Sequence, residues 1–271
     1  MVDLATHPVP PRSGGTEAAP SRFTPDIRAI DTGRPWVWLN AAWRDIAAAP
    51  AISFTYGVLA VVSSVLLVFG LAANDLHYLI LPLAAGFMLV GPVLAVGLYE
   101  ASRQLESGGR PTLISVLSAY HRNGTQIAAI GLVLMLALLA WIRVAFLVFA
   151  IFFGSEPPAL DMLVSRIFFS VETIPFLLTG TAIGAVIATA VFALSVVSLP
   201  MLLDRDTDVF TAIVTSIAAV RKNWRAMAVW AALIALFTAA GIATGFIGLA
   251  LAFPLIGHAS WHCYRDVVGR S

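Results

Sequence analysis

The chain has little charge, one cysteine and one lysine. Only 11% of its 271 residues are charged, against about 25% in an average soluble domain. The single cysteine, Cys263, excludes an internal disulfide framework. A net charge of +1 gives no electrostatic reason to expect a nucleic-acid partner. The sequence also lacks a Walker loop, HExxH, CxxC and a nucleophile elbow, so we do not expect an enzyme.

What is abundant is apolar sequence. Hydrophobic residues make up 59% of the chain, and apolar runs of roughly 20 residues recur, the length that crosses a hydrocarbon core as a helix. The alternating ten-residue segments of a membrane strand barrel are absent. The sequence therefore predicts an all-α, polytopic membrane protein whose first partner is the lipid bilayer.

The apolar runs predict six membrane-spanning helices. We expect them at about 51–73, 76–99, 125–141 (or, as one tilted helix, to 153), 174–203, 225–245 and 247–265. The last two must be separate, because one helix from Arg225 to Arg265 would be about 60 Å long, twice a bilayer. We therefore expect a turn near Thr244 and Gly245.

Segments with apolar residues at helical spacing precede several spans. We expect amphipathic helices at 35–48, 111–122 and 208–222, and a further surface helix at 160–171. The apolar faces that this spacing predicts are Trp36, Leu39, Trp43 and Ile46 in the first helix, Leu113, Val116, Leu117 and Tyr120 in the second, and Phe210, Ile213, Val214 and Ile217 in the third. Indole rings favour the headgroup level, which suits an interfacial helix.

The order of amphipathic helix, span, and span with a late proline occurs three times. The internal match is closest between His121-Arg122-Asn123 and Arg221-Lys222-Asn223. It predicts repeat units of about 35–103, 110–205 and 208–265, within a membrane domain of 34–268 that follows a disordered tail over residues 1–33. The prolines that break the spans are Pro92, Pro200 and Pro254.

The small residues predict where membrane helices pack closely, and the basic residues predict which loops are cytoplasmic. Gly180-x3-Gly184 and Gly241-x3-Gly245 have the spacing of close-packed membrane helices, within the chain or in a self-associated form. Lysine and arginine are concentrated in the N-terminal region, in the loop between the second and third predicted spans, in the loop between the fourth and fifth, and at the C-terminus. Because basic loops stay inside, we expect both termini and all three amphipathic helices to be cytoplasmic.

The candidate intramembrane polar residues are His258, His262, Arg143, Glu100 and Arg103. His258 and His262 share one helical face and could hold a metal or haem, although hydrogen bonding between helices is the more common role of such residues. Glu100 and Arg103 are spaced to form an ion pair. Arg143 either anchors at the outer interface beside Trp141 or faces the bundle.

Four motifs resemble a bacterial family of integral membrane proteins. They are GPVLAVGLYEASRQLESG at 91–108, WIRVAF at 141–146, SLPMLLDR at 198–205 and PLIGHASWHCYRD at 254–266. The family is a domain of unknown function, and some members carry the label "putative cytochrome c oxidase subunit". The resemblance, over about 36–268, implies six helices in a bacterial inner membrane and no particular activity.

Three functions remain open on the sequence alone. The first is a non-catalytic accessory, assembly or membrane-organising protein, which implies a membrane protein complex or self-association. The second is a small-solute or ion transporter, because broken helices often line substrate sites. The third is a haem or metal carrier that uses His258 and His262, although we expect no cofactor.

Overall fold

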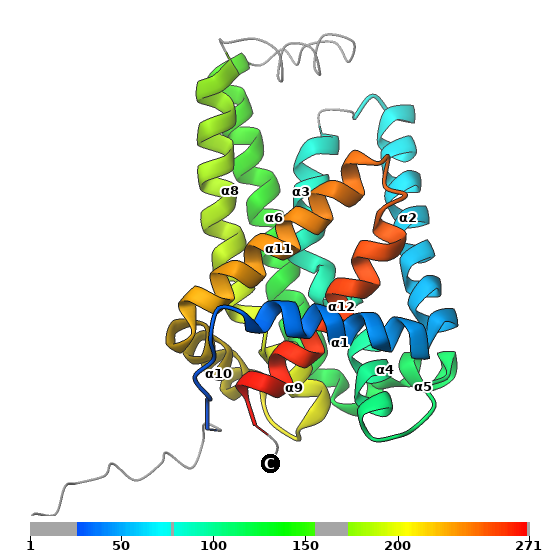
Figure 1. Ribbon diagram of the computed structural model, residues 1–271. Helices are drawn as coiled ribbons and strands as arrows, with labels where there is room; N and C mark the ends of the chain where they lie inside the picture. Colours follow the sequence, from blue (N-terminus) through cyan, green and yellow to red (C-terminus); the bar gives the residue numbers. More distant parts are fainter. Residues whose placement is uncertain (1–25, 77–78, 155–172, 270–271) are drawn as a thin grey trace, which may run out of the picture.

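The computed structural model describes residues 26–76, 79–154 and 173–269, and the chain is helical with no strand over those residues (Figure 1). The helices are α1 Arg34–Ala48, α2 Pro50–Ala73, α3 Ile80–Leu94, α4 Val96–Glu106, α5 Leu113–Arg122, α6 Gly124–Phe153, α8 Ile174–Ser195, α9 Ser198–Asp204, α10 Val209–Lys222, α11 Trp224–Ala243 and α12 Leu249–Val267. The expected surface helix at 160–171 lies outside the described residues.

Four helical segments of the described chain are long and apolar enough to cross a membrane. They are α2, α6, α11 and the segment Ile174–Asp204, which joins α8 and α9. A fifth is possible if the pair α3 and α4, bent by 40°, counts as one span. An all-helical membrane protein is therefore confirmed, while the number six stays a prediction. α12 falls outside the set because its C-terminal half carries His258, His262, Arg265 and Asp266.

α12 is the central helix of the fold. It packs against α1, α2, α4, α9 and α11, and thirteen of its nineteen residues are buried. α1 lies across it at one end of the bundle, where α4, α5, α9 and α10 also lie (Figure 1). A helix buried on nearly all sides needs apolar or internally paired side chains around its whole circumference, so the polar residues of α12 must find partners on other helices.

Three short helices each run into a long helix through a single non-helical residue. The junction residues are Ala49 between α1 and α2, Asn123 between α5 and α6, and Asn223 between α10 and α11. Their φ and ψ are −132° and 58°, −135° and 51°, and −114° and 31°. All three short helices lie within a residue or two of the ranges expected from the sequence.

Two of the short helices, α5 and α10, turn mainly small residues toward the bundle and large apolar residues outward. α5 buries Val116 and Ala119, and α10 buries Ala212, Thr215, Ser216 and Ala219. Ile114 is 83% exposed and Phe210 is 76% exposed. In α1, the expected apolar face is divided: Leu39 and Ile46 are buried in the bundle together with Trp38, whereas Trp36 and Trp43 are exposed.

Two of the three helix-breaking prolines sit beside a break, and the third lies inside a continuous helix. The break at Ala95 follows Pro92, and the break at Val196 and Val197 precedes Pro200 by one helical turn. Pro254 stays within α12, where it has no N–H to donate to the carbonyl of Ala250. A Cβ added to Gly57 of α2 would lie 2.1 Å from that carbonyl oxygen.

The turn expected between the last two spans is confirmed. α11 ends at Ala243, and Gly245 and Phe246 both have positive φ before α12 begins at Leu249. Of the glycines in the two small-residue motifs, Gly184 approaches Trp141 and Gly241 approaches Leu249, while Gly180 and Gly245 have no neighbour at the Cβ position within 4 Å. Closer helix contacts lie at Gly57, Gly86, Gly97 and Gly257.

The described end of the expected disordered tail, residues 26–33, is held against the bundle. We placed disorder over 1–33, but residues 27–30 are held by the bundle. Arg28 N–H donates to the carbonyl of Val267 at 2.8 Å. Ile30 N–H donates to Asn223 Oδ1 at 2.9 Å, and Asn223 Nδ2 donates to the carbonyl of Arg28 at 3.0 Å. The backbone pairing supplied by Asn223 and α12 fixes this segment despite its weak apolar pattern.

Candidate functional site

His258 lies in the interior of the bundle, in contact with two serine hydroxyls. Its side chain is fully buried. Its Nε2 is 3.0 Å from Ser53 Oγ of α2, and its Nδ1 is 2.8 Å from Ser102 Oγ of α4. The Ser53 hydroxyl donates to the carbonyl of Ala49 at 2.9 Å. The imidazole therefore joins three helices, and both of its ring nitrogens are engaged.

Asp45 of α1 connects the two histidines. Its Oδ2 accepts from Ser102 Oγ at 2.6 Å and lies 2.8 Å from His262 Nε2. The same oxygen is 3.9 Å from His258 Nδ1. The side chain of Asp45 is 14% exposed and that of His262 is 23% exposed, so the chain of contacts leads from the buried His258 toward the surface.

Asp266 links the C-terminal turn of α12 to α1. Arg34 donates to both carboxylate oxygens, at 2.6 Å and 2.7 Å, and Trp38 Nε1 donates to Oδ2 at 2.9 Å. The hydrogen bond to Asp266 raises the pKa of Arg34 above its ordinary value. Three charge-assisted bonds from one helix orient the end of α12 against α1.

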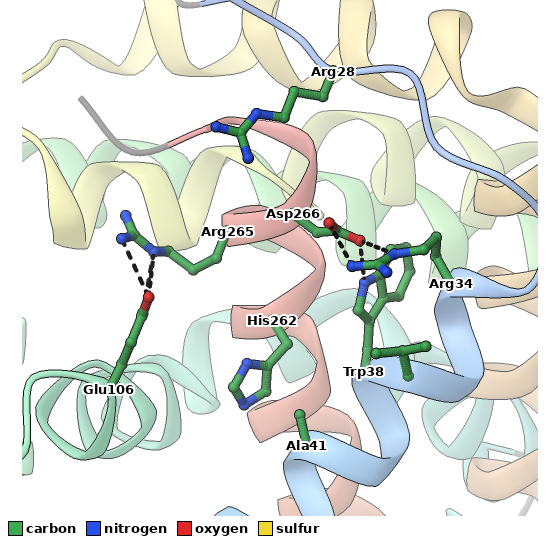
Figure 2. A pocket seen from close by; sticks show the side chains of 9 residues that line it. Arg28, Arg34, Trp38, Ala41, Glu106, His262, Arg265 and Asp266 are labelled. Atoms are coloured by element: carbon green, nitrogen blue, oxygen red, sulfur yellow. Dashed lines mark hydrogen bonds and ion pairs between the residues drawn. The ribbon is translucent and has the colours of Figure 1, made fainter.

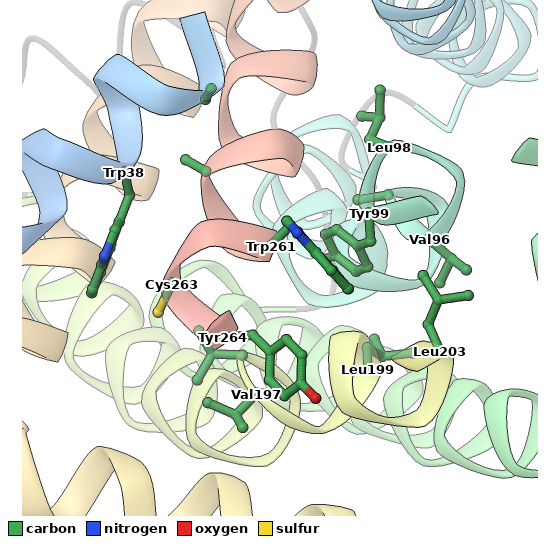
Figure 3. Packing of buried hydrophobic residues seen from close by; sticks show 14 of the residues in the cluster. Trp38, Val96, Leu98, Tyr99, Val197, Leu199, Leu203, Trp261, Cys263 and Tyr264 are labelled. Atoms are coloured by element: carbon green, nitrogen blue, oxygen red, sulfur yellow. The ribbon is translucent and has the colours of Figure 1, made fainter. Parts of the chain in front are cut away.

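A second ionic cluster ties α12 to α4 and α9. Arg265 pairs with Glu106 at 3.1 Å and with Asp204 at 3.1 Å. The Tyr264 hydroxyl donates to Asp204 at 2.8 Å and accepts from Arg205 Nε at 3.1 Å. Trp261 Nε1 donates to Glu106 at 3.1 Å. The rings of Trp261 and Tyr264 also pack in an apolar layer beside residues of α4 and α9 (Figure 3).

An open cleft of about 290 Å³ lies between the two clusters. Its polar lining includes Arg34 and Asp266 from the first, Glu106 and Arg265 from the second, and His262. Figure 2 shows Arg34 and Trp38 turned toward Asp266 on one side and Glu106 turned toward Arg265 on the other. His262 is the member of the cleft that also contacts Asp45. A polar cleft open to solvent therefore lies one side chain away from the buried chain of contacts.

Glu100 and Arg103 form the expected ion pair, apart from the cleft. Arg103 donates to both oxygens of Glu100 at 2.7 Å, and Gln104 donates to Glu100 at 2.7 Å. Glu100 is 3% exposed. Arg143 lies on the exposed side of α6, which is one continuous helix, and it makes no hydrogen bond or ion pair with the described residues. Neither belongs to the His258 cluster.

The geometry limits what His258 can do chemically. Ser53, His258 and Asp45 are the residue types of a hydrolytic triad, but the Ser53 hydroxyl is fully buried and donates to Ala49, so no substrate carbonyl can reach it. Within the described ranges, no group of three or more His, Cys, Asp or Glu side chains could hold a metal ion. What the arrangement can do is hold and pass protons.

Asp45, Ser53 and Ser102 were not among the residues singled out from the sequence. Asp45 lies off the predicted apolar face of α1, and serines are common in membrane helices. The sequence carries only a weak indication of these partners. Ser102 lies two residues after Glu100 in one of the four motifs, and a buried His258 needs polar partners that its own helix does not supply.

The fold and the site define a polytopic α-helical membrane protein with a buried polar cluster at one end. Residues 80–204 match the model of the family described as "Predicted integral membrane protein (DUF2189)", a domain of unknown function. The resemblance given by the sequence motifs is thus shown over that part of the chain. The comparisons with curated proteins and with solved structures found no match.

Proposed function

We propose that the chain spans a bacterial inner membrane six times as three repeated hairpins, with α3–α4 and α12 as the second and sixth spans. The near-equal dihedral angles at Ala49, Asn123 and Asn223 support the repeat. So does the burial of Ala119 and Ala219 at matching positions of α5 and α10. Both termini and the short helices are then cytoplasmic, by the distribution of basic residues.

Hydrogen bonds between successive units also support the repeat. Asn123 Nδ2 donates to the carbonyl of Thr207, which lies just before α10, at 3.0 Å. Asn223, the matching residue one unit later, holds Arg28 and Ile30, which lie just before α1. Each asparagine therefore binds the segment that leads into the short helix of the following unit, with the first unit following the third.

We infer that the protein is a non-catalytic accessory protein that organises a membrane assembly. The observation that carries this is the outward position of large apolar residues on three short helices at one end of the bundle (Figure 1). The exposed residues are Trp36 and Trp43 on α1, Leu113, Ile114 and Leu117 on α5, and Phe210 and Val214 on α10. Apolar surface at the headgroup level suits lipid or the membrane-embedded part of another protein.

Purification from native membranes into lipid nanodiscs tests this function. We expect one partner protein at fixed stoichiometry. Ile114→Ser or Phe210→Ser should remove the partner, because each replaces the outward apolar contact. Leu66→Ser, on the exposed side of α2 (66% exposed), is the matched control and should keep it. A protein with no partner at fixed stoichiometry, or equal loss in all three variants, would contradict the proposal.

Cysteine labelling tests the topology. With Cys263 replaced by Ser, Asp75→Cys lies in the link between α2 and α3 and should react with an impermeant reagent added from the periplasmic side. The link carries no lysine or arginine, which is why we place it outside. Labelling from the cytoplasmic side alone would contradict the orientation.

A small-solute or ion transporter is the second candidate, and the broken helices favour it. The breaks at Ala95 and at Val196 and Val197 are buried, and discontinuous helices often line substrate sites. Solute or ion flux into proteoliposomes that contain the purified chain alone would place this function first. The haem or metal carrier stays a prediction that no contact of the described residues favours, because both ring nitrogens of His258 already face hydroxyls.

A further inference from the structure

The contacts around His258 require more hydrogen atoms than neutral His258 and an anionic Asp45 supply. The Ser53 hydroxyl donates to Ala49, so the contact between Ser53 and His258 needs a hydrogen on Nε2. Ser102 Oγ then makes two further contacts, one with His258 Nδ1 and one with Asp45 Oδ2. A serine hydroxyl has one hydrogen and can donate to only one of them.

One additional proton supplies the missing hydrogen, and it can lie on either His258 or Asp45. With the proton on His258 Nδ1, the imidazolium donates to Ser102, which donates to the carboxylate of Asp45. With the proton on Asp45 Oδ2, the carboxylic acid donates to Ser102, which donates to a neutral His258. Moving the Ser102 hydrogen and the extra proton together converts one arrangement into the other, and Ser102 stays neutral throughout.

We propose that Asp45, Ser102 and His258 form a buried proton-binding site, which His262 connects to the open cleft. The 2.6 Å separation of Ser102 Oγ and Asp45 Oδ2 fits a charge-assisted or acid hydrogen bond and would be repulsive without a hydrogen between the oxygens. Because either arrangement leaves His258 and Asp45 with no net charge, the bound proton also removes the cost of an unpaired buried ion.

The groups that face His258 support a site for a single proton. From α1 comes Asp45, and from the next turn of α12 comes His262; these are its charged or titratable neighbours. α2 and α4 present the hydroxyls of Ser53 and Ser102. α9 presents Asp204 to Tyr264 and Arg265 instead, and the one charged residue of α11, Arg225, lies over Trp224.

The path for the proton follows the exposure of the side chains. His262 lines the cleft, and its Nε2 contacts Asp45 Oδ2 at 2.8 Å. Asp45 contacts Ser102, and Ser102 contacts the fully buried His258. Each step is a single hydrogen bond between side chains, so a proton that enters from the cleft reaches His258 without crossing an apolar gap.

Proton linkage in the full chain, in nanodiscs, tests the site. At a pH above the ordinary pKa of histidine, the unfolded chain has a neutral His258 and an anionic Asp45. The proposed site in the folded chain holds one more proton, on His258 or on Asp45. Stability therefore falls as the pH rises above about 7. Asp45→Asn places an amide N–H where the acid O–H would be, so it should keep the hydrogen-bond pattern and give a pH-independent unfolding midpoint in SDS. Asp208→Asn, an exposed cap with the same substitution, should keep the wild-type slope.

Spectroscopy of the wild-type chain keeps the test decisive if Asp45→Asn fails to fold. We expect ¹⁵N signals of His258 that report a hydrogen on both ring nitrogens, or a neutral ring together with the infrared band of one protonated carboxyl group. A neutral His258 with no protonated carboxyl group would overturn the proposal. So would an Asp45→Asn variant with the pH dependence of the wild type, or a wild type with none.

Discussion

Gly57 lies where α2 crosses α12, against the carbonyl that Pro254 leaves without a helical donor. An added methyl group would lie 2.1 Å from the Ala250 oxygen and 2.8 Å from its carbon. Both atoms belong to the backbone of α12, so no side-chain rotation relieves the contact. Gly57→Ala must therefore push α2 away from the central helix or distort α12 at its proline.

The magnitude follows from the distance that must be recovered. Ordinary van der Waals contact begins near 3.4 Å, so the two helices must separate locally by roughly 1 Å. Overpacking of a well-packed interface costs about 1–3 kcal/mol, and a clash with backbone belongs at the upper end. We expect Gly57→Ala to lower the free energy of unfolding by about 3 kcal/mol.

Gly70→Ala is the matched control, because it lies on the same helix with nothing within 4 Å of the Cβ position. It should be neutral or stabilising by up to about 1 kcal/mol, since alanine is the better helix former. SDS titration of both variants, followed by circular dichroism, measures the difference. Equal stability of the two variants would refute the close approach of α2 to α12.

Three further predictions use the same SDS titration, and the last adds a binding measurement. Trp38→Phe should lower the free energy of unfolding by about 1.5–3 kcal/mol, because it removes a hydrogen bond to the carboxylate of Asp266. Trp230→Phe should cost clearly less, because the buried Nε1 of Trp230 has no partner among the described residues. Equal losses in the two variants would contradict this. Arg103→Ala leaves the buried carboxylate of Glu100 without its cation and should cost about 3 kcal/mol, and a loss under about 1 kcal/mol would mean that the pair is solvated. His258→Gln should fold with a loss of about 1–3 kcal/mol, because the amide reaches only part of the hydroxyl pair, and it should bind no less metal or haem than the wild type in an absorption spectrum and metal analysis.

The short helices could be located from the sequence, but their orientation could not. Asn123 and Asn223 end apolar-periodic segments, and proline at residue 50 begins a helix, so the boundaries followed from local signals. Periodicity alone does not say whether a large apolar face meets protein or lipid. Ile114 and Phe210 face outward because membrane helices pack through small residues, here Ala119 and Ala219.

The histidines were found from the sequence, while their partners were not. His258 and His262 stood out as polar residues of an apolar segment. Asp45 lies more than two hundred residues away along the chain, and only the packing of α1 across α12 brings it to His262. Ser53 and Ser102 carry no signal of their own, because a serine in a membrane helix most often bonds its own backbone. Contacts of this kind depend on tertiary packing that no local pattern encodes.

If the chain is the threefold repeat that we propose, the asparagine bonds at Asn123 and Asn223 have an evolutionary consequence. If each unit once was a separate short chain, the same bonds would have run between subunits, and three copies would have closed a trimer around a central axis. Fusion of the copies would then leave one junction without a covalent link, between the third unit and the first. In this chain Asn223 closes that junction by holding Arg28 and Ile30, whereas the first unit has at the matching place Ala49, whose side chain cannot form such a bond.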